Sequence, residues 1–200
     1  MSEYGIDYRI TDFEGYDHVE WVTKRKIAAA TYAAVQGKVK VVELVTGIFH
    51  SWVFRPELGI DIKKNVYTPV GPGTLRFATT AKSDIGRSVA RLSIIALDPA
   101  TAAAVPGKLH IAGHNVSYDE IRDIVARVKG LPKGTIRSRD LKTEKENLSK
   151  HPSDNVLDYI AIVIGEGKVD FCDNSNDLVN PGRRFWEWRT IEDELRHPEH

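Results

Sequence analysis

Short apolar runs alternate along the chain with segments of helical composition. The segment 18–37 is rich in alanine and other helix formers and stops at Gly37, a residue type favoured just past a helix end. The next segment, 38–45, contains four valines in a short stretch, which is typical of a buried strand. We therefore expect a helix over 18–37 followed directly by a strand over 38–45.

The alternation continues through the middle of the chain. We expect a short helix within 46–58 that breaks near Pro56, because proline removes a backbone donor and clashes with the preceding turn. The segments 60–73 and 74–81 have the pattern of short strands. Gly71, Pro72 and Gly73 form a turn signal between them, so the sequence predicts a hairpin.

The second half of the chain is mainly helical in its pattern. Ser83 can cap a helix over 83–99, and the strand pattern at 107–112 precedes a glycine turn. Ser117 and Glu120 have the spacing of a capping box, which indicates the start of another helix. Further helical segments are expected over 117–130, within the charged stretch 137–154, over 155–167 and from about Thr190 onward.

This order of elements favours an α/β fold. The strands at 39–45 and 107–112 would belong to one parallel sheet. A buried parallel strand needs neighbours on both sides, and the sequence supplies few other strands of this kind. The start of the chain agrees, because the residues at 2–5 look like the exit of a buried strand, and only Met1 precedes them. We therefore expect an incomplete parallel sheet.

Composition narrows the possible classes of protein. The chain has 200 residues, enough for one domain, and 28 basic residues balance 28 acidic ones, so no global positive field attracts nucleic acid. No apolar run approaches the roughly 18 residues that span a membrane, and the N-terminus has no signal-peptide pattern. The single cysteine, Cys172, suits a reducing compartment, so a cytoplasmic location is expected.

Six stretches, in order, resemble the second half of the NmrA-like and isoflavone-reductase-like proteins, which are atypical short-chain dehydrogenases/reductases. They are SEYGIDY at 2–8, WVTKRKI at 21–27, VKVVELVTGIFHSWVF at 39–54, GPGTLRFATTAKSDIG at 71–86, GKLHIAGHNVSYDEI at 107–121 and WEWRT at 186–190. The resemblance extends over nearly the whole chain. It implies that residues 1–200 form the C-terminal part of an NAD(P)-binding Rossmann-type fold with an α+β substrate-side subdomain.

The resemblance also implies a division of the chain. Residues 1–46 would be a remnant of the Rossmann sheet with the catalytic-lysine helix, and 47–200 mainly the substrate-side subdomain, with strand 107–112 returning to the sheet. Family members carry a dinucleotide-binding Rossmann half ahead of this region, so we expect a truncated protein. The stretches of this chain that come nearest to the glycine fingerprint of a dinucleotide-binding turn are GPGTLR at 71–76 and GEGKVD at 165–170. Both lack the final glycine and the strand-to-helix context. The family cofactor, NADP(H), is therefore not expected to bind this chain alone.

Lys24 is the candidate catalytic residue. In the family, the corresponding helix carries a lysine for proton transfer near the nicotinamide, followed four positions later by an arginine; Lys24 matches the lysine, and Ala28 replaces the arginine. Trp21, Lys24, Ala28, Thr31 and Val35 share one face of an ideal helix, and an inward lysine is suited to acid–base chemistry. The alternative is a lysine whose stem lies on the surface and whose ammonium reaches water.

Gly47 and Phe49 are the candidate cofactor-binding residues, because they match a family stretch that walls the cofactor and substrate cleft. The alternative for an apolar residue just after a strand is ordinary core packing. The trio Asp84-Ile85-Gly86 also matches a family motif, although an acid in the first turn of a helix is sufficiently explained by the helix dipole.

Other chemistries are not indicated. His50, His110 and His114 share no metal-ligand spacing, so no metal site is expected. The chain has no G-x-S-x-G pattern, which argues against a hydrolase of that type. Trp186 and Trp188 lie among arginines, and we interpret this cluster as a tail packed against the domain rather than as a stacking platform for nucleic acid.

Two hypotheses follow. The first is an NADPH-dependent reductase of a small molecule, with hydride from the cofactor and Lys24 as general acid or base. The second is a non-catalytic, dinucleotide-sensing regulator or a scaffold. Neither has nucleic acid or membrane as a partner. In both cases an exposed sheet edge and an apolar helix face predict self-association or aggregation of the chain.

Overall fold

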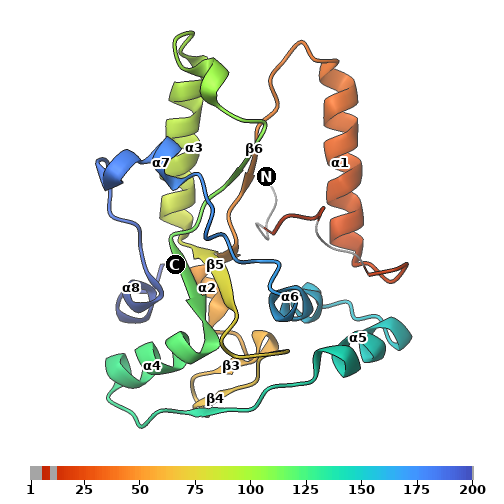
Figure 1. The fold of residues 1–200 in the computed structure, drawn as a ribbon, viewed down its shortest axis with the longest axis vertical. Helices are drawn as coiled ribbons and strands as arrows, with labels where there is room; N and C mark the ends of the chain where they lie inside the picture. Colours follow the sequence, from red (N-terminus) through yellow and green to blue (C-terminus); the bar gives the residue numbers. More distant parts are fainter. Residues whose placement is uncertain (1–5, 10–12, 200) are drawn as a thin grey trace.

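The computed structural model describes residues 6–9 and 13–199, in which helices alternate with short strands (Figure 1). The helices are α1 (Val19–Val35), α2 (His50–Val53), α3 (Lys82–Leu97), α4 (Tyr118–Lys129), α5 (Leu141–Lys150), α6 (Val156–Gly165), α7 (Asn176–Val179) and α8 (Ile191–Arg196). The strands are β1 (Glu43–Val45), β2 (Ile48–Phe49), β3 (Ile60–Asp61), β4 (Val66–Tyr67), β5 (Arg76–Thr80), β6 (Lys108–His110), β7 (His114–Ser117) and β8 (Thr135–Ile136). The predicted strand exit at 2–5 lies outside the described residues.

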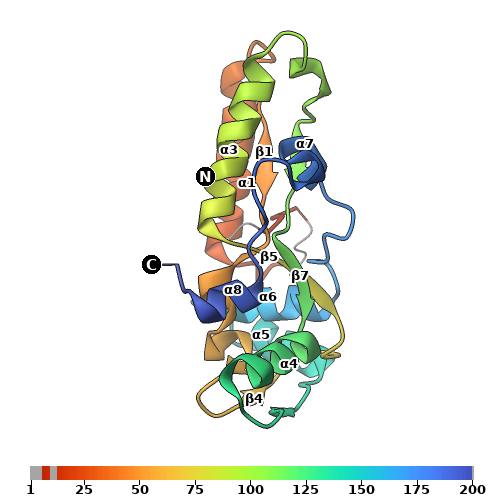
Figure 2. The same ribbon diagram turned by 90° about the vertical axis from the view of Figure 1, so that its left-hand side faces the viewer.

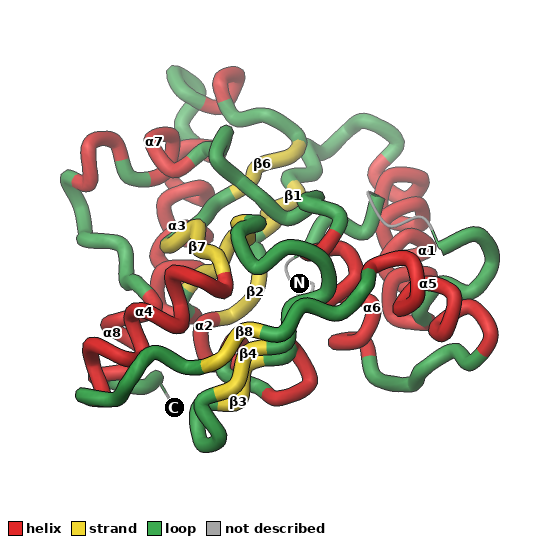
Figure 3. Tube along the Cα trace, turned by 60° about the horizontal axis from the view of Figure 1, so that its bottom comes forward, coloured by secondary structure: helices red, strands yellow, loops and turns green. Residues whose placement is uncertain are grey.

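The strands form three small sheets. β1 pairs in parallel with β6, in the register Glu43 to Lys108, which confirms the prediction that the two segments belong to one parallel sheet. β5 lies between β2, which is parallel to it, and β7, which is antiparallel. β4 lies between β3 and β8, as Figure 3 shows. The parallel pairs are therefore short pieces of sheet joined to antiparallel ones.

Helices flank the β1–β6 pair. Figure 1 shows the pair between α3 and α1, and in Figure 2, which is viewed from the side of α3, α1 lies behind α3. The central element of the lower half is α6, in which every residue except the half-buried Asp158 is buried, as expected for a helix that is apolar on most sides. The described residues include no helix that is long and apolar enough to cross a membrane.

Several predicted elements are confirmed with their boundaries. The helix expected at 18–37 is α1, and Ser117 and Glu120 form the predicted capping box of α4. The charged stretch 137–154 contains α5, in which only Leu148 is buried. Thr190 caps α8, so the last helix also begins where the sequence predicts. These are elements whose signals lie within the element itself.

The predicted strand at 38–45 is too long. Only Glu43–Val45 forms a strand, because β6 offers three residues for pairing and the described residues place no other strand beside 38–42. A valine-rich segment without a neighbouring strand has no partner for ladder hydrogen bonds, so it does not form a strand.

The predicted hairpin between 60–73 and 74–81 is wrong. β3 and β4 pair with each other inside the first segment, whereas β5 pairs with β2 and β7. The turn at Gly71 is pressed against the end of α6 instead: a side chain at Gly71 would lie 3.1 Å from the carbonyl oxygen of Gly165. The turn therefore carries the chain from one sheet to another.

Ser83 is also not the cap that the sequence predicts. The N-cap of α3 is Ala81, and it makes no side-chain hydrogen bond. The hydroxyl of Ser83 donates instead to Glu199 near the end of the chain. A remote partner thus replaces the local one.

Candidate functional site

α1 and β1 run in opposite directions and are joined near one end (Figure 1). The hydroxyl of Tyr32, in the second half of α1, donates to Glu43 at the start of β1 over 2.7 Å. Going back along the helix from Tyr32 to Lys24 covers about 12 Å at 1.5 Å per residue. Going forward along the strand from Glu43 to Gly47 covers about 13 Å at roughly 3.3 Å per residue. Lys24 and Gly47 therefore lie at similar distances from the Tyr32–Glu43 contact, and Gly47 lies just beyond the carboxyl end of β1.

The face of α1 that carries Lys24 is partly covered. Trp21 is buried, and Lys24, Ala28 and Val35 are half-buried, as predicted for one helix face. Thr31 differs, because it is exposed and its hydroxyl bonds back to its own helix. The inward face thus contains the predicted residues except Thr31, and Lys24 lies on it.

Aromatic packing fixes the first turn of α1. The Trp21 ring stacks on Phe13 at 5.5 Å between centroids and meets the edge of Tyr159 from α6 at 5.8 Å. Such pairs contribute about 0.5–1.5 kcal/mol each beyond the apolar area that they bury. The position of Lys24, one turn further along, therefore depends on this anchor.

Gly47 and Phe49 follow β1 directly. Gly47 has φ +65°, and a Cβ there would lie 2.3 Å from the carbonyl oxygen of Ala78 in β5, so only glycine fits. Phe49 belongs to β2, is half-buried, and contacts the ring of Trp52 edge-on at 6.4 Å. Close packing against Ala78 thus explains the glycine at position 47. Contact of Gly47 or Phe49 with a cofactor stays a prediction.

An ionic network lies at the other end of the strands. Asp7 is buried, and it accepts from the ammonium of Lys108 and from Arg9, while Glu43 accepts from Arg9 over 2.6 Å and from the hydroxyl of Tyr8 over 2.7 Å. Burial and the bond to Glu43 raise the pKa of Tyr8 to about 12, and burial lowers the pKa of Lys108. The sequence pattern does not indicate this network.

The network has a structural role. Glu43 and Lys108 are the first residues of β1 and β6, whereas ligands of parallel sheets bind outside the carboxyl ends of the strands. Tyr8, which donates to Glu43, and Asp7, which accepts from Lys108, belong to the segment that precedes α1. The network therefore holds that segment against the sheet.

Asp84 anchors the C-terminal segment. Its side chain is fully buried and accepts from the backbone N–H of Arg189 over 2.8 Å and from the guanidinium of Arg87 over 2.9 Å, while burial raises its pKa. Trp188, beside this contact, is buried and meets Trp186 at 5.3 Å. The predicted packed tail is confirmed, and Asp84 does more than favour the helix dipole.

His50 is buried directly after β2, with only 1% of its surface exposed. Burial, and next the neighbouring His114, lower its pKa to about 3. The described residues contain no group of three or more His, Cys, Asp or Glu side chains that could hold a metal ion. His50 is therefore a neutral residue of the core.

We expect acid to destabilise the fold through His50. Between pH 6.5 and about 3 the unfolded chain binds a proton at this residue that the folded chain does not, so stability falls as the pH falls through this range. The slope is at most about 1.4 kcal/mol per pH unit. Urea unfolding at pH 7.5, 6, 5 and 4.5 should show a flatter pH dependence for His50→Leu than for the unchanged protein. The exposed His151→Leu is the control, and equal slopes in all three proteins would refute the assignment.

The chain is similar to known proteins both in sequence and in fold. No family model matches the chain. An NmrA-like family domain-containing oxidoreductase from Gibberella moniliformis is 31% identical over 155 residues, which cover 74% of this chain and 46% of the relative. The chain is therefore similar in sequence to an NmrA-like protein. It spans less than half the length of this relative.

The fold of this chain has a solved counterpart. A crystal structure of a nucleoside-diphosphate-sugar epimerase from Staphylococcus aureus superposes with a TM-score of 0.53 at 18% identity, over 85% of this chain and 56% of that one. At this identity the likeness concerns the fold alone. It confirms the predicted α/β, Rossmann-like class with an incomplete parallel sheet.

The glycine turns of this chain do not fit a dinucleotide. The turn at Gly71 leads into β5 and not into a helix, and Gly165 is the last residue of α6. A side chain at Gly165 would lie 2.6 Å from the carbonyl oxygen of Val70, so this glycine permits close packing of the turn on α6. A phosphate-binding turn instead presents its N–H groups at the start of a helix. These two glycine turns therefore lack the geometry of a phosphate-binding turn.

Proposed function

We propose that this chain provides the lysine-bearing part of the active site of an isoflavone-reductase-like, NADPH-dependent reductase. The observation that carries the proposal is the position of Lys24 on the inward face of α1, about as far from the Tyr32–Glu43 contact as the carboxyl end of β1 is. Small molecules bind α/β sheets at this end of the strands. The substrate would be a small carbonyl compound.

The chemistry assigned to Lys24 is proton transfer. A lysine ammonium has three donors and no acceptor, so it can hold a proton at a substrate oxygen on which negative charge develops. Partial burial strengthens such an interaction because fewer water molecules compete for the oxygen. Phe49 and its neighbour Trp52 would provide the apolar wall of the same cleft.

A specific observation favours the alternative of a non-catalytic regulator or scaffold. Ala28 is half-buried on the face that carries Lys24, at the position where the family pattern has an arginine. An alanine there can neither orient a carboxylate or phosphate nor change the charge beside the lysine. A regulator would bind dinucleotide without turnover, whereas a scaffold would not bind it.

We predict that the 200-residue chain does not bind NADPH with useful affinity, because its glycine turns do not fit the pyrophosphate. Titration by calorimetry and by nicotinamide fluorescence measures this. A chimera with a family-derived Rossmann half ahead of Met1 is the matched control, and it should bind. Saturable micromolar binding by the unfused chain would contradict the prediction. Binding by the chimera without turnover of any carbonyl substrate would favour the regulator.

We further propose that two copies of the chain associate through α1 and the edge of β1. Along the 17 residues of α1 only Trp21 is buried, and Val19, Ile27 and Val39 are 68%, 61% and 62% exposed. Within the described residues β1 pairs only with β6, which leaves its other edge available. Exposed apolar groups beside an unpaired strand edge promote association.

Size-exclusion chromatography with light scattering tests this association. We expect a dimer, and the substitution Ile27→Lys should make it monomeric. Ile94→Lys on α3 is the matched control, because Ile94 is similarly exposed on a different helix. A stable monomer whose residues 38–45 are strongly protected from hydrogen exchange would overturn the proposal.

A further inference from the structure

The segment 188–199 lies as a strap against the rest of the protein. It contains α8, which lies beside α4 in Figure 3. Ile191 of the strap is fully buried, and Trp188 packs into the same apolar cluster as Ile111, the residue that follows β6. These two side chains fix where the strap lies.

Backbone groups of the strap fill two side-chain acceptors of the neighbouring elements. The N–H of Arg189 donates to the buried carboxylate of Asp84 in α3 over 2.8 Å. The N–H of Ile191 donates to the Nδ1 atom of His114, the first residue of β7, over 3.2 Å. Of these two acceptors, the imidazole is the one whose ordinary titration lies near neutral pH.

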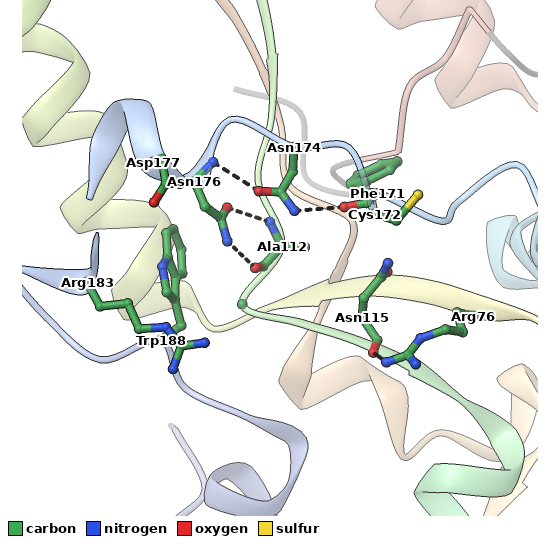
Figure 4. A pocket seen from close by; sticks show the side chains of 11 residues that line it. Arg76, Ala112, Asn115, Phe171, Cys172, Asn174, Asn176, Asp177, Arg183 and Trp188 are labelled. Atoms are coloured by element: carbon green, nitrogen blue, oxygen red, sulfur yellow. Dashed lines mark hydrogen bonds between the residues drawn. The ribbon is translucent and has the colours of Figure 1, made fainter. Parts of the chain in front are cut away.

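The strap covers the loop that joins β6 to β7. A Cβ at Gly113 in this loop would lie 3.0 Å from the carbonyl oxygen of Arg189. The loop itself is fixed, because the side-chain amide of Asn176 donates to the carbonyl oxygen of Ala112 over 2.7 Å and accepts from its N–H over 3.1 Å (Figure 4). Ligands of parallel sheets bind outside the carboxyl ends of the strands, where this loop lies. A movement of the strap would therefore uncover this end of β6.

The bond to His114 requires a neutral imidazole. Its Nδ1 atom accepts the N–H of Ile191, so the single proton of the neutral ring lies on Nε2. A second proton would have to bind at Nδ1, where it would point at the N–H that now donates. The hydrogen bond would be lost, and two donors would face each other. Protonation of the ring and this backbone bond therefore exclude each other.

Titratable groups from four elements surround His114. Burial is the largest influence, and it lowers the pKa of His114. Glu120 on α4 and Asp193 on α8 act to raise this pKa, whereas Arg76 on β5 acts to lower it. The neighbouring His50 on α2 is itself held neutral by burial. The docked ring therefore resists protonation more than a histidine in water does.

We propose that the segment 188–199 is a pH-sensitive strap, which is docked while His114 is neutral and loosens when a proton binds this ring. A histidine in water has a pKa of 6.5, and the pKa of the docked ring is lower. Above pH 6.5 the ring is neutral in both forms, so docking is at full strength. Below pH 6.5 the loosened form binds a proton that the docked form does not. Docking then weakens by up to about tenfold per pH unit.

The carboxylates of this region act in the opposite direction or at lower pH. Burial raises the pKa of Asp84, so the docked form binds a proton more readily at this residue and acid favours docking. Although burial acts to raise it, hydrogen bonds from Ser83 lower the pKa of Glu199 below its ordinary 4.5. Bonds from Thr190 lower the pKa of Asp193 below 3.8. These two acids weaken docking only below about pH 5, so a loss of docking between pH 7 and 5 points to a histidine.

Hydrogen exchange with mass spectrometry tests the strap in the unchanged protein. Protection factors, which relate each exchange rate to the intrinsic rate at the same pH, are measured at pH 7, 6 and 5 for peptides that cover 188–199 and α6. We expect the protection of the strap to fall at least about tenfold from pH 7 to 5 and to stay below that of α6 throughout. The absence of a fall would overturn the proposal. Equal protection of the strap and α6 would also overturn it, because the opening would then be global unfolding.

Three variants assign the effect to one histidine. His114→Asn keeps an acceptor for the N–H of Ile191 and takes up no proton, so its strap protection should change by less than about twofold between pH 7 and 5. His50→Leu should keep the full pH dependence of the strap, because neither ring nitrogen of His50 has a hydrogen bond to the described residues of the strap. The exposed His151→Asn is the matched control and should also keep it. A fall that persists in His114→Asn, or one that His50→Leu abolishes, would overturn the proposal.

Discussion

The substitution Gly47→Ala is expected to destabilise the protein severely. The new Cβ would lie 2.3 Å from the carbonyl oxygen and 2.6 Å from the carbonyl carbon of Ala78, in the central strand β5. Backbone in the middle of a sheet cannot move aside cheaply, so overlap adds to the cost of φ +65° for a residue with a side chain. We expect a loss of at least about 4 kcal/mol, measured by urea unfolding.

Gly37→Ala separates the two causes. Gly37 has φ +72°, close to that of Gly47, but a Cβ there would meet no atom within 4 Å. This variant should lose only about 1–2 kcal/mol from the backbone conformation. If the two variants were equally stable, β1 and β5 would not approach each other as described at Gly47, and the wall of the proposed cleft would have to be placed elsewhere.

The elements predicted from sequence are those whose signals are local. α1 ends where glycine follows an alanine-rich run, and α4 begins at a capping box, so both can be identified from a few neighbouring residues. That β1 and β6 belong to one parallel sheet could be predicted because each segment has the apolar composition of a buried strand, whereas their direct pairing is a finding of the structure.

The wrong predictions depend on partners that are distant in the sequence. The turn at Gly71 resembles a hairpin turn, but contact with Gly165 redirects the chain into another sheet. Ser83 has the right position for a cap, but Glu199 takes its hydroxyl. A pattern of a few residues contains no information on which remote group will compete for a hydrogen bond.

The same distinction holds for the candidate site. Helical spacing alone places Lys24 on the face of Trp21, and the structure finds that face partly covered. The requirement for glycine at position 47 depends on Ala78, and the attachment of the segment before α7 to the end of β6 depends on the bonds of Asn176 to Ala112. Neither could be predicted from sequence, because each joins segments that only the fold brings together.

The second large effect is expected at Lys24. In the chimera that carries a family-derived Rossmann half, Lys24→Ala should lower kcat by about 100-fold or more, the usual contribution of a positioned general acid or base. Lys26→Ala is the matched control, because Lys26 is exposed on the same helix and lies off the inward face. Alanine suits a helix interior at both positions, so neither change should disturb α1.

Steady-state oxidation of NADPH by these three chimeras, with a panel of small carbonyl compounds, tests most directly whether Lys24 belongs to a reductase site. NADPH affinity is measured alongside, so that a loss of turnover can be separated from a loss of binding. We expect a fall of about 100-fold or more in kcat for Lys24→Ala at unchanged NADPH affinity, and a change within about threefold for Lys26→Ala. Equal effects of the two substitutions would contradict this expectation.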